Sequence, residues 1–431
     1  MEPFQLTAAQ AAAALADGSL DSETLTRSCL TRIESRDADI KAWSYVDPAQ
    51  ALRTARELDK QPRRSSLHGV PIAIKDMIDT ADQPTQHNSP IYVGHQPSHD
   101  AACVAVLRAA GAIILGKTDT HEFASGGRLA ASRNPHDLTR TAGGSSSGSA
   151  AAVGDFHAPL ALGTQTAGST IRPASFCGIF AMKPTWNAMP REGAKIYSLT
   201  LDTIGWFGRS VADLGLLSDV FAVSRRPWTP NAGTKGLRIA LCRTPYWHEA
   251  SPESQSMVED AAAVLRKSGA VVEELSLPPE FATANDLQNI IMRGEGRPAF
   301  LAEYRNAFDL LHKDFRNRVE DADNITPDIL LNALDRIAAM RPVFDRIASG
   351  YDAILTPAAT GEAPKLALNT TGNPMFNRMW TALHAPCITI PWGSGPNNMP
   401  IGIQLVAPRY YDAELLGVAD AVSQLSPAVA A

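Results

Sequence analysis

The segment TAGGSSSGSAAAV at residues 141–153 joins a glycine- and serine-rich loop to the start of an alanine-rich helix. The short apolar run that follows it, at residues 158–163, predicts a buried strand. Upstream we predict a strand, a helix and a second strand, at residues 68–75 (HGVPIAIK), 101–110 and 112–116. Strands that alternate with helices favour βαβ units. The sequence therefore predicts an α/β fold built on a sheet.

The rest of the chain is predicted to be mostly helical near its start and in its middle, at residues 7–57 and 280–350. The run RRPWTPNAGTKG at residues 225–236 has the proline and glycine punctuation of a linker. After it we predict a strand, a helix and two further strands, at residues 237–242, 254–268, 271–277 and 352–356. The pattern does not give the order of the strands.

Composition excludes several classes of protein. The chain has 431 residues, 45% of them hydrophobic, and this is ample material for a large core. A net charge of −6 with scattered basic residues argues against a nucleic-acid partner. No apolar run reaches the ~18 residues of a membrane span, and no secretory signal opens the chain. The five cysteines are an odd number and lie far apart, so we expect a cytoplasmic protein.

Motifs for metals and nucleotides are missing. His95 and His99 are four residues apart, but Pro97 between them breaks the helix that would align them, and no HExxH occurs. No Lys follows the loop at residues 143–149 as in a phosphate-binding GK[ST], and GxGxxG is absent. We therefore expect neither a metal nor an organic cofactor. A GxSxG elbow is also absent, although a Ser-His-Asp triad stays open.

One lysine and two small-residue loops remain as candidates for chemistry. Lys75 ends a buried apolar run, where it either pairs with a carboxylate such as Asp76 or loses its charge and becomes a usable base. Gly143-Gly144 before Ser145 permits unusual backbone conformations. The loop at residues 166–169 (TAGS) can direct successive N–H groups toward one point, as an oxyanion site requires. Alternatively, both loops are tight turns chosen for close packing.

Taken together, these segments closely resemble the amidase signature family. The matching stretches, in chain order, are HGVPIAIKD (68–76), GKTDTHEFASG (116–126), NPHD (134–137), GGSSSGSAAAVG (143–154), ALGTQTAGSTIRPASFCG (161–178), MKPT (182–185) and LDTIGWFGRSVAD (201–213). The tail segments TALHAPCITIPWG (381–393) and MPIGIQLVA (399–407) look like the end of the family pattern. The resemblance implies one amidase domain over residues 1–431, with a signature core at 66–213 and a central mixed β-sheet flanked by α-helices.

The resemblance also implies a Ser–cis-Ser–Lys triad and an acyl-enzyme route to amide hydrolysis. On that pattern Ser169 is the nucleophile, Ser145 is the bridging serine with a cis peptide before it, and Lys75 is the base. The oxyanion donors would be backbone N–H groups of the same loop, at Thr166, Ala167, Gly168 and Ser169. By likeness to malonamidase, Arg172 would bind a substrate carboxylate, although an ion pair that supports the loop is an equal alternative.

The sequence departs from the common family pattern at a few positions. Ser147 replaces a glycine of GGSSGGS, Gln165 and Ala167 change GTDTGGS, and Arg172 follows the nucleophile by three residues rather than two. These variants are similar to malonamidase, carboxybiuret hydrolase and related small-amide hydrolases. They remove no triad residue.

The substrate and the assembly stay open at this stage. The alternatives are a hydrolase of carbamates or ureido compounds, the glutaminase subunit of a tRNA-dependent amidotransferase, and a scaffold subunit without catalytic activity, although the intact triad argues against the last. We expect a small-molecule amide as substrate and a homodimer as the commonest symmetric assembly. We expect the variable segments to shape the substrate pocket, around Tyr197, Trp206 and residues 280–380.

Overall fold

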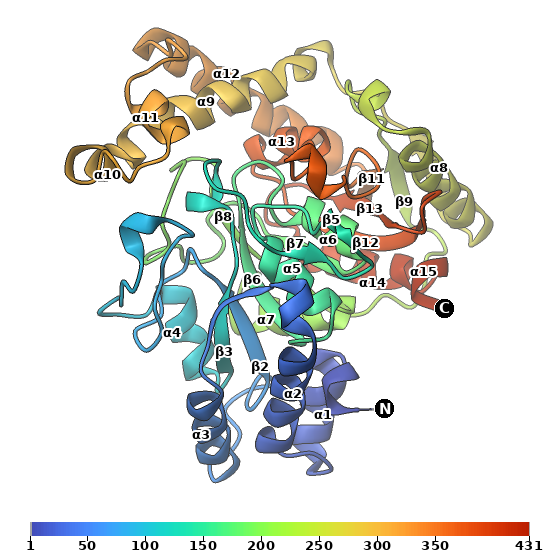
Figure 1. Cartoon of the computed structure of the whole chain (residues 1–431). Helices are drawn as coiled ribbons and strands as arrows, with labels where there is room; N and C mark the ends of the chain where they lie inside the picture. Colours follow the sequence, from blue (N-terminus) through green and yellow to red (C-terminus); the bar gives the residue numbers. More distant parts are fainter. Residues whose placement is uncertain (1, 431) are drawn as a thin grey trace.

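A twisted sheet of eleven strands runs through the molecule (Figure 1). The structure is a computed structural model that describes residues 2–430, so Met1 and Ala431, the ends of the predicted domain, lie outside it. In their order across the sheet, the strands are β1 (Trp43–Val46), β3 (Ile113–Thr118), β2 (Pro71–Lys75), β6 (Leu160–Gln165), β8 (Thr203–Gly208), β7 (Phe180–Lys183), β12 (Cys387–Ser394), β13 (Pro400–Val406), β11 (Ala353–Pro357), β9 (Arg238–Leu241) and β10 (Val271–Glu274). A separate pair consists of β4 (Arg133–Asn134) and β5 (Asp137–Thr141).

The sheet is mixed, as the resemblance implies. Strands β3, β2 and β6 are parallel neighbours, and so are β10, β9 and β11. The strands between these two groups pair antiparallel with their neighbours. The two parallel groups therefore lie in opposite halves of the sheet, and the first group contains the strands that lead into the candidate site.

Helices cover both faces of this sheet. The α-helices of the described chain are α1 (Ala8–Asp17), α2 (Ser22–Ile40), α3 (Pro48–Asp59), α4 (Ala102–Ala109), α5 (Ser147–Gly154), α6 (Ile171–Cys177), α7 (Val211–Val220), α8 (Pro252–Lys267), α9 (Ala284–Ala299), α10 (Leu301–Asn306), α11 (Lys313–Val319), α12 (Pro327–Ala348), α13 (Met375–Ala382), α14 (Asp412–Ser423) and α15 (Pro427–Ala430). Ile72 and Ile74 of β2 pack in the core cluster of α4 and α7, whereas Ala73 between them packs in that of α2 and α5. This alternation is the period of two that a strand imposes on its side chains.

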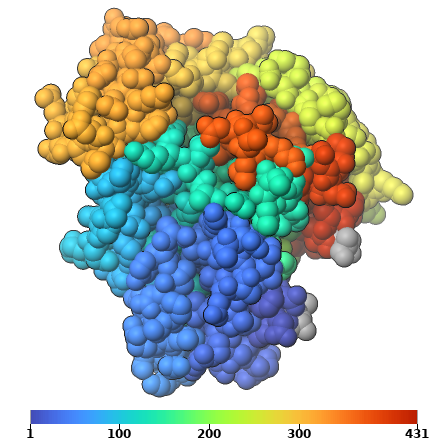
Figure 2. Space-filling view, in the orientation of Figure 1, coloured from blue at the N-terminus to red at the C-terminus, as the bar shows by residue number. Residues whose placement is uncertain are grey.

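The helices α9–α12 form an arm at one end of the molecule, and α1–α3 lie at the opposite end (Figures 1 and 2). Helix α9 packs against α12 and α13 through an apolar cluster that includes Leu287, Ile337 and Trp380. The arm thus reaches the sheet through α13, which is the helix just before β12.

The structure confirms the predicted α/β class and the predominantly helical region at 280–350, and it corrects three details. Residues 7–57 are not all helical, because Trp43–Val46 forms β1 against β3. The strand predicted to end at Gly116 continues to Thr118, because Lys117 and Thr118 pair with the end of β2. Strands β7, β8, β12 and β13 were not predicted as strands.

Three further observations concern membrane-spanning helices, cysteines and metal sites. Within residues 2–430, none of the helices combines the length and apolar character that a membrane crossing requires. All five cysteines are buried and unpaired. The same described residues contain no group of three or more His, Cys, Asp or Glu side chains that could hold a metal ion.

Candidate active site

The candidate site lies at the carboxyl ends of β2 and β6. Lys75 is the last residue of β2, and the loop with Ser169 links the end of β6 to α6. Because β2 and β6 are parallel neighbours, their carboxyl ends meet at one edge of the sheet, where ligands of α/β proteins commonly bind. Ser145 precedes α5, whose residues pack beneath β2 and β6. Three segments that are distant in sequence therefore meet at one place.

Lys75 is bound to hydroxyl groups and not to a carboxylate. Its Nζ donates to Ser145 Oγ over 2.8 Å and to Thr164 Oγ1 over 2.6 Å. Asp76, the alternative partner, instead lies 3.5 Å from the amine of Lys117. The structure therefore contradicts the ion pair between Lys75 and Asp76 and joins Lys75 to one of the candidate serines.

Burial lowers the pKa of Lys75 well below its ordinary value, because the fully buried amine has lost the water that would stabilise its charge. The negative charge that opposes this effect most is Asp202. That carboxyl is itself buried, which raises its pKa to about 7, although a hydrogen bond from Thr166 counteracts the rise. Because that carboxyl is only weakly acidic, it does little to restore the pKa of Lys75.

The backbone around Ser145 is held tightly. The peptide bond between Gly144 and Ser145 is cis, and the Ser145 carbonyl accepts hydrogen bonds from Thr120 Oγ1 and His121 N at 3.0 and 3.3 Å. A Cβ on Gly144 would lie 2.8 Å from His121 Nε2 and from Thr371 Cγ2, so only glycine fits there. Ser147, a departure from the family pattern, donates to the Gly143 carbonyl over 2.7 Å and so supports the same loop.

The loop before Ser169 has its carbonyl groups occupied and its N–H groups free. Gln288 Nε2, Thr381 Oγ1 and the N–H of Arg172 donate to successive carbonyls, those of Thr166, Ala167 and Gly168, at 2.9, 2.8 and 3.1 Å. Within the described chain, no acceptor is recorded for the N–H groups of residues 166–169. Such a run of unused donors is the arrangement that an oxyanion site needs.

Gln165, another departure, sits at the end of β6 beside this loop. Its Oε1 accepts hydrogen bonds from the N–H groups of Thr170 and Ile171, at 2.9 and 3.1 Å. Its Nε2 donates to Thr381 Oγ1 over 3.0 Å, and Thr381 in turn holds the carbonyl of Ala167. The amide thus fixes both the loop and the start of α6 without adding a charge near Lys75.

Ser145 and Ser169 line one cavity of about 170 Å³. No hydrogen bond joins their hydroxyl oxygens in the part of the chain that the structure describes. Catalytic hydrogen bonds are often long in a site without substrate and shorten in the complex. The structure therefore brings Lys75 and Ser145 into contact and places Ser169 across the same small space.

Arg172 also lines this cavity. Its Nη2 donates to the Gly144 carbonyl over 2.6 Å and to Thr371 Oγ1 over 3.2 Å, whereas its buried Nε and Nη1 have no recorded partner in the described chain. Burial, together with the nearby positive charge of Arg378, lowers the pKa of Arg172 to about 9. The ion pair that was the alternative role of Arg172 is not formed.

Of the two aromatic residues expected at the pocket, only Tyr197 lines the cavity. Trp206 is buried in the core on the α7 side of the sheet, where its Nε1 donates to the Leu214 carbonyl. The prediction for Trp206 is wrong because the side chain of this residue of β8 points away from the site. The segment 280–380 does contribute to the cavity, through Met292, residues 371–374 and Arg378.

His121 and Arg378 line the cavity but were not predicted from the sequence. Burial and the positive charge of Arg172 lower the pKa of His121 to about 3, so this imidazole is uncharged at neutral pH. His121 lies inside the quoted motif GKTDTHEFASG, and that motif was the available signal. Arg378 lies just before the quoted tail segment and carried no signal of its own.

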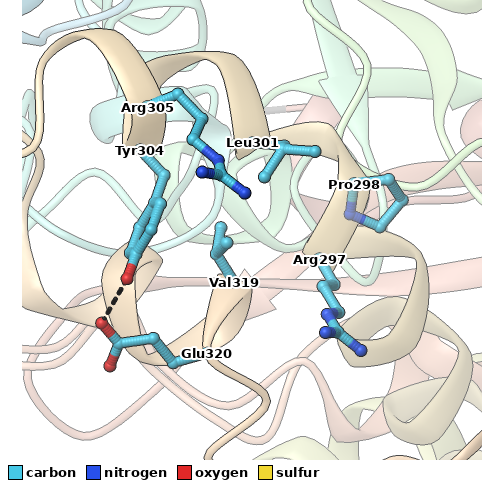
Figure 3. Close-up of a pocket in the computed structure, with 7 residues that line it drawn as sticks. All are labelled: Arg297, Pro298, Leu301, Tyr304, Arg305, Val319 and Glu320. Carbon is cyan, nitrogen blue, oxygen red and sulfur yellow. Dashed lines mark hydrogen bonds between the residues drawn. The ribbon is translucent and has the colours of Figure 1, made fainter.

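A larger cavity of about 420 Å³ lies on the arm, among α9, α10 and α11 (Figure 3). It is lined by Arg297, Pro298, Leu301, Tyr304, Arg305, Val319 and Glu320. The Tyr304 hydroxyl donates to Glu320 Oε1 over 2.8 Å at its edge. None of these side chains is a serine, cysteine, histidine or lysine, so this cavity contains neither of the residue types of the predicted triad.

Comparison with known proteins gives a consistent result. Residues 24–416 match the family described as Amidase. The A-type subunit of the glutamyl-tRNA(Gln) amidotransferase from Chloroflexus aggregans is 32% identical, over 99% of this chain and 97% of that protein. The peptide amidase of Stenotrophomonas maltophilia superposes with a TM-score of 0.85 at 28% identity, over 98% of this chain and 97% of that one. A protein of a vestigial complex that reveals the origins of an s-triazine catabolic enzyme superposes with a TM-score of 0.87 at 26% identity, over 97% and 98% of the chains.

Proposed function

The chain belongs to the amidase family, and on that premise we propose that it is an enzyme that hydrolyses the C–N bond of a small-molecule amide with Ser169 as nucleophile. The observation that carries the proposal is the 2.8 Å hydrogen bond between Lys75 Nζ and Ser145 Oγ. This lysine is buried and forms no ion pair with a carboxylate in the described chain. A lysine in this setting is available as a base and has no structural ion pair to maintain. The unused N–H groups of residues 166–169 supply the complementary feature.

In the first half of the reaction, the lone pair of neutral Lys75 accepts the hydroxyl proton of Ser145, and Ser145 Oγ takes the proton of Ser169. The Ser169 Oγ forms a bond to the amide carbonyl carbon. The carbonyl oxygen becomes an oxyanion beside the N–H groups of Thr166, Ala167, Gly168 and Ser169, which stabilise the developing charge. Ser145 then donates its proton to the nitrogen and takes the proton of Lys75 in return, so the lysine is neutral again; the C–N bond breaks, and ammonia or an amine leaves.

In the second half, water attacks the acyl carbon and transfers a proton through Ser145 to Lys75. The bond to Ser169 Oγ breaks, Ser169 regains its proton, and a carboxylic acid is released. Each proton that the lysine accepts is returned within the cycle. The route uses side chains and backbone groups of this chain together with one water molecule, and calls for no metal or organic cofactor.

The substrate that we propose carries a carboxylate, as in the malonamidase and carboxybiuret hydrolase group that the sequence variants resemble. Arg172 supports this assignment, because two of its nitrogens have no protein partner and it lines the cavity with Ser169. A planar guanidinium can bind both oxygens of a carboxylate. A carbamate or ureido acid would fit the same acyl chemistry and is the second candidate.

A role as the glutaminase subunit of an amidotransferase is the remaining alternative, since the relative from Chloroflexus aggregans belongs to such an enzyme and matches over nearly its full length. Such a role would depend on partner chains. We instead propose a self-sufficient cytoplasmic enzyme that acts as a homodimer and needs neither nucleic acid nor membrane.

The test is ammonia release by the purified chain alone from malonamate, glutamine, propionamide and a ureido acid, with Ser169→Ala as control. We expect malonamate or the ureido acid to be hydrolysed best and Ser169→Ala to be inactive on all four. The proposal would be contradicted if glutamine were the only one of the four compounds hydrolysed, or if hydrolysis required added partner subunits. Undiminished hydrolysis by Ser169→Ala would remove the assigned nucleophile.

A further inference from the structure

A second arginine also lines the cavity. Arg378 lies on α13, and Arg172 lies at the start of α6, and both line the space with Ser145 and Ser169. No Asp or Glu is among the residues that line this cavity. A site with two guanidinium groups and no acidic side chain attracts anions.

Neither arginine forms an ion pair in the described part of the chain. Some other partly buried arginines do form them, as Arg140 does with Asp137 and Arg409 with Asp345. Arg378 instead donates from Nη1 to the Oε1 of Gln288, at 2.7 Å. Two like charges without a counterion are costly in a buried place, and burial lowers the pKa of both guanidinium groups. An anionic occupant would relieve that cost.

The free nitrogens of Arg172 strengthen this point. Its side chain is only 4% exposed, yet Nε and Nη1 have no recorded partner among the described residues. Buried donors in native proteins are nearly always satisfied, so unpaired ones call for a ligand or an ordered water. A carboxylate oxygen is the acceptor that best matches a guanidinium.

Arg378 is also linked by hydrogen bonds to the loop that precedes Ser169. Gln288 of α9 is fully buried and accepts from Arg378 through Oε1, while its Nε2 donates to the carbonyl of Thr166 over 2.9 Å. One amide thus fixes both the second arginine and the loop proposed to bind the oxyanion. Gln288 therefore fixes the position of Arg378 relative to the loop at Thr166, and this in turn would set the distance between a bound anion and the scissile carbonyl.

We propose that Arg378 and Arg172 form a two-arginine clamp that binds one carboxylate on the acyl part of the substrate. Arg378 is then a specificity-determining residue, and the substrate class is a short amide or ureido compound whose acyl chain ends in a carboxylate. The cavity of about 170 Å³ restricts that chain to a few atoms. The inference rests on the proposed function and adds to it a second binding group that the motifs do not contain.

The experiment measures malonate binding by calorimetry, which needs no turnover, for wild type, Arg378→Ala, Arg378→Gln and Arg378→Lys. A hydrogen bond to a charged group is worth ~1.5–3 kcal/mol, which corresponds to a loss of about 10- to 150-fold in affinity. We expect this loss for Arg378→Ala and Arg378→Gln and a smaller loss for Arg378→Lys. Arg341→Ala is the matched control: this arginine of α12 is also partly buried but donates to the Ala382 carbonyl and does not line the cavity. It should leave malonate binding unchanged.

Turnover of the neutral ester p-nitrophenyl acetate provides the second readout. Arg378→Ala should lose much less in kcat/KM on this ester than in malonate affinity, because the ester has no carboxylate for the clamp to bind. Equal losses on ester turnover and malonate binding would overturn the inference and make Arg378 a structural support. Unchanged malonate binding in the variants, or no malonate binding by wild type, would overturn it as well. A wild type that binds malonate but hydrolyses no amide would contradict the proposed function and leave the clamp standing.

Discussion

Two adjacent strands of the sheet each end near a buried lysine, and the two lysines have opposite surroundings. Lys75 ends β2 and Lys117 is the second-last residue of β3. Lys117 Nζ donates to the Ile78 carbonyl over 2.8 Å and lies 3.5 Å from Asp76 Oδ1. Lys75 contacts only hydroxyl groups, those of Ser145 and Thr164. Both are fully buried, so their partners make the difference.

From this difference we infer that Lys117 has a structural role and that Lys75 is available for proton transfer. Burial lowers the pKa of both amines, but around Lys117 the charges of Asp76 and Asp79 oppose the shift. For Lys75 the opposing charge is Asp202, whose own pKa is raised to about 7 by burial. Lys117 therefore keeps its proton to higher pH as part of an ion pair. Lys75 loses its proton more readily and can serve as a base.

The largest effect is expected at Ser169, the proposed nucleophile that Lys75 activates through Ser145. We assign no such serine to Lys117. Ser169→Ala removes the nucleophile and should reduce kcat by several decades (~10³–10⁶-fold), as nucleophile knockouts do elsewhere. Steady-state ammonia release measures the loss. Labelling by a fluorophosphonate, mapped by mass spectrometry, should occur at Ser169. Labelling at Ser145 would reverse the assignment of the two serines.

Replacing each lysine by methionine separates the two roles. Lys75→Met should reduce kcat/KM by ~10²–10⁴-fold, the usual contribution of a general base, and leave the fold intact. Lys117→Met leaves the buried Asp76 without its cationic partner and should cost about 3–5 kcal/mol of unfolding free energy. Chemical denaturation and steady-state kinetics on both variants measure this. A destabilised Lys75→Met would give Lys75 the same structural role as Lys117. A fully active Lys75→Arg would also contradict the role of base, because a guanidinium cannot give up its proton.

The pH dependence of stability sharpens the same comparison. Because the pKa of Lys75 is lowered in the folded chain, the unfolded chain binds more protons between that value and ~10.4. Unfolding free energy should therefore rise with pH across this interval, and Lys75→Met should remove part of the slope. Denaturation of wild type and variant at several pH values checks the sign. An unchanged slope in the variant would mean that Lys75 is charged in the fold.

A smaller and selective effect is expected at Arg172, which lines the cavity together with Ser145 and Ser169. Arg172→Ala removes a charged hydrogen bond of ~1.5–3 kcal/mol, which corresponds to about 10- to 150-fold in kcat/KM on an acidic amide such as malonamate. Propionamide has no carboxylate and should be spared. Equal losses on the two substrates would assign Arg172 to support of the Gly144 carbonyl.

The smallest effect is expected at Thr164, the second hydroxyl on Lys75. Thr164→Val keeps the shape and removes the 2.6 Å hydrogen bond. Loss of one neutral hydrogen bond is worth ~1 kcal/mol, or about fivefold in kcat/KM. Thr85→Val removes the corresponding hydroxyl at Lys117 and should leave kcat/KM unchanged. A larger loss for Thr85→Val than for Thr164→Val would contradict the assignment of the base to Lys75.

The local pattern of the sequence predicted the α/β class and the strands that lead to the site, because apolar runs and glycine loops express local preferences. The resemblance supplied the candidate roles of Lys75, Ser145 and Ser169, and those roles stay predictions, as do the core at residues 66–213 and the homodimer. Arg378 and Gln288 could not be found in this way, since the long-range packing of α9 and α13 brings Arg378 to the cavity and places Gln288 against it. Trp206 was misplaced because the face on which a strand residue lies depends on the register of β8 with β6.

The most direct test of the central claim is the protonation state of Lys75 itself. Chains labelled with ¹³C at lysine Cε can be titrated by nuclear magnetic resonance, and the spectra of Lys75→Met and Lys117→Met assign the two signals. The account predicts that Lys75 loses its proton at a clearly lower pH than Lys117 and is uncharged where kcat/KM reaches its plateau. A Lys75 amine that stays protonated up to its ordinary pKa of about 10.4, or that titrates together with Lys117, would contradict the account.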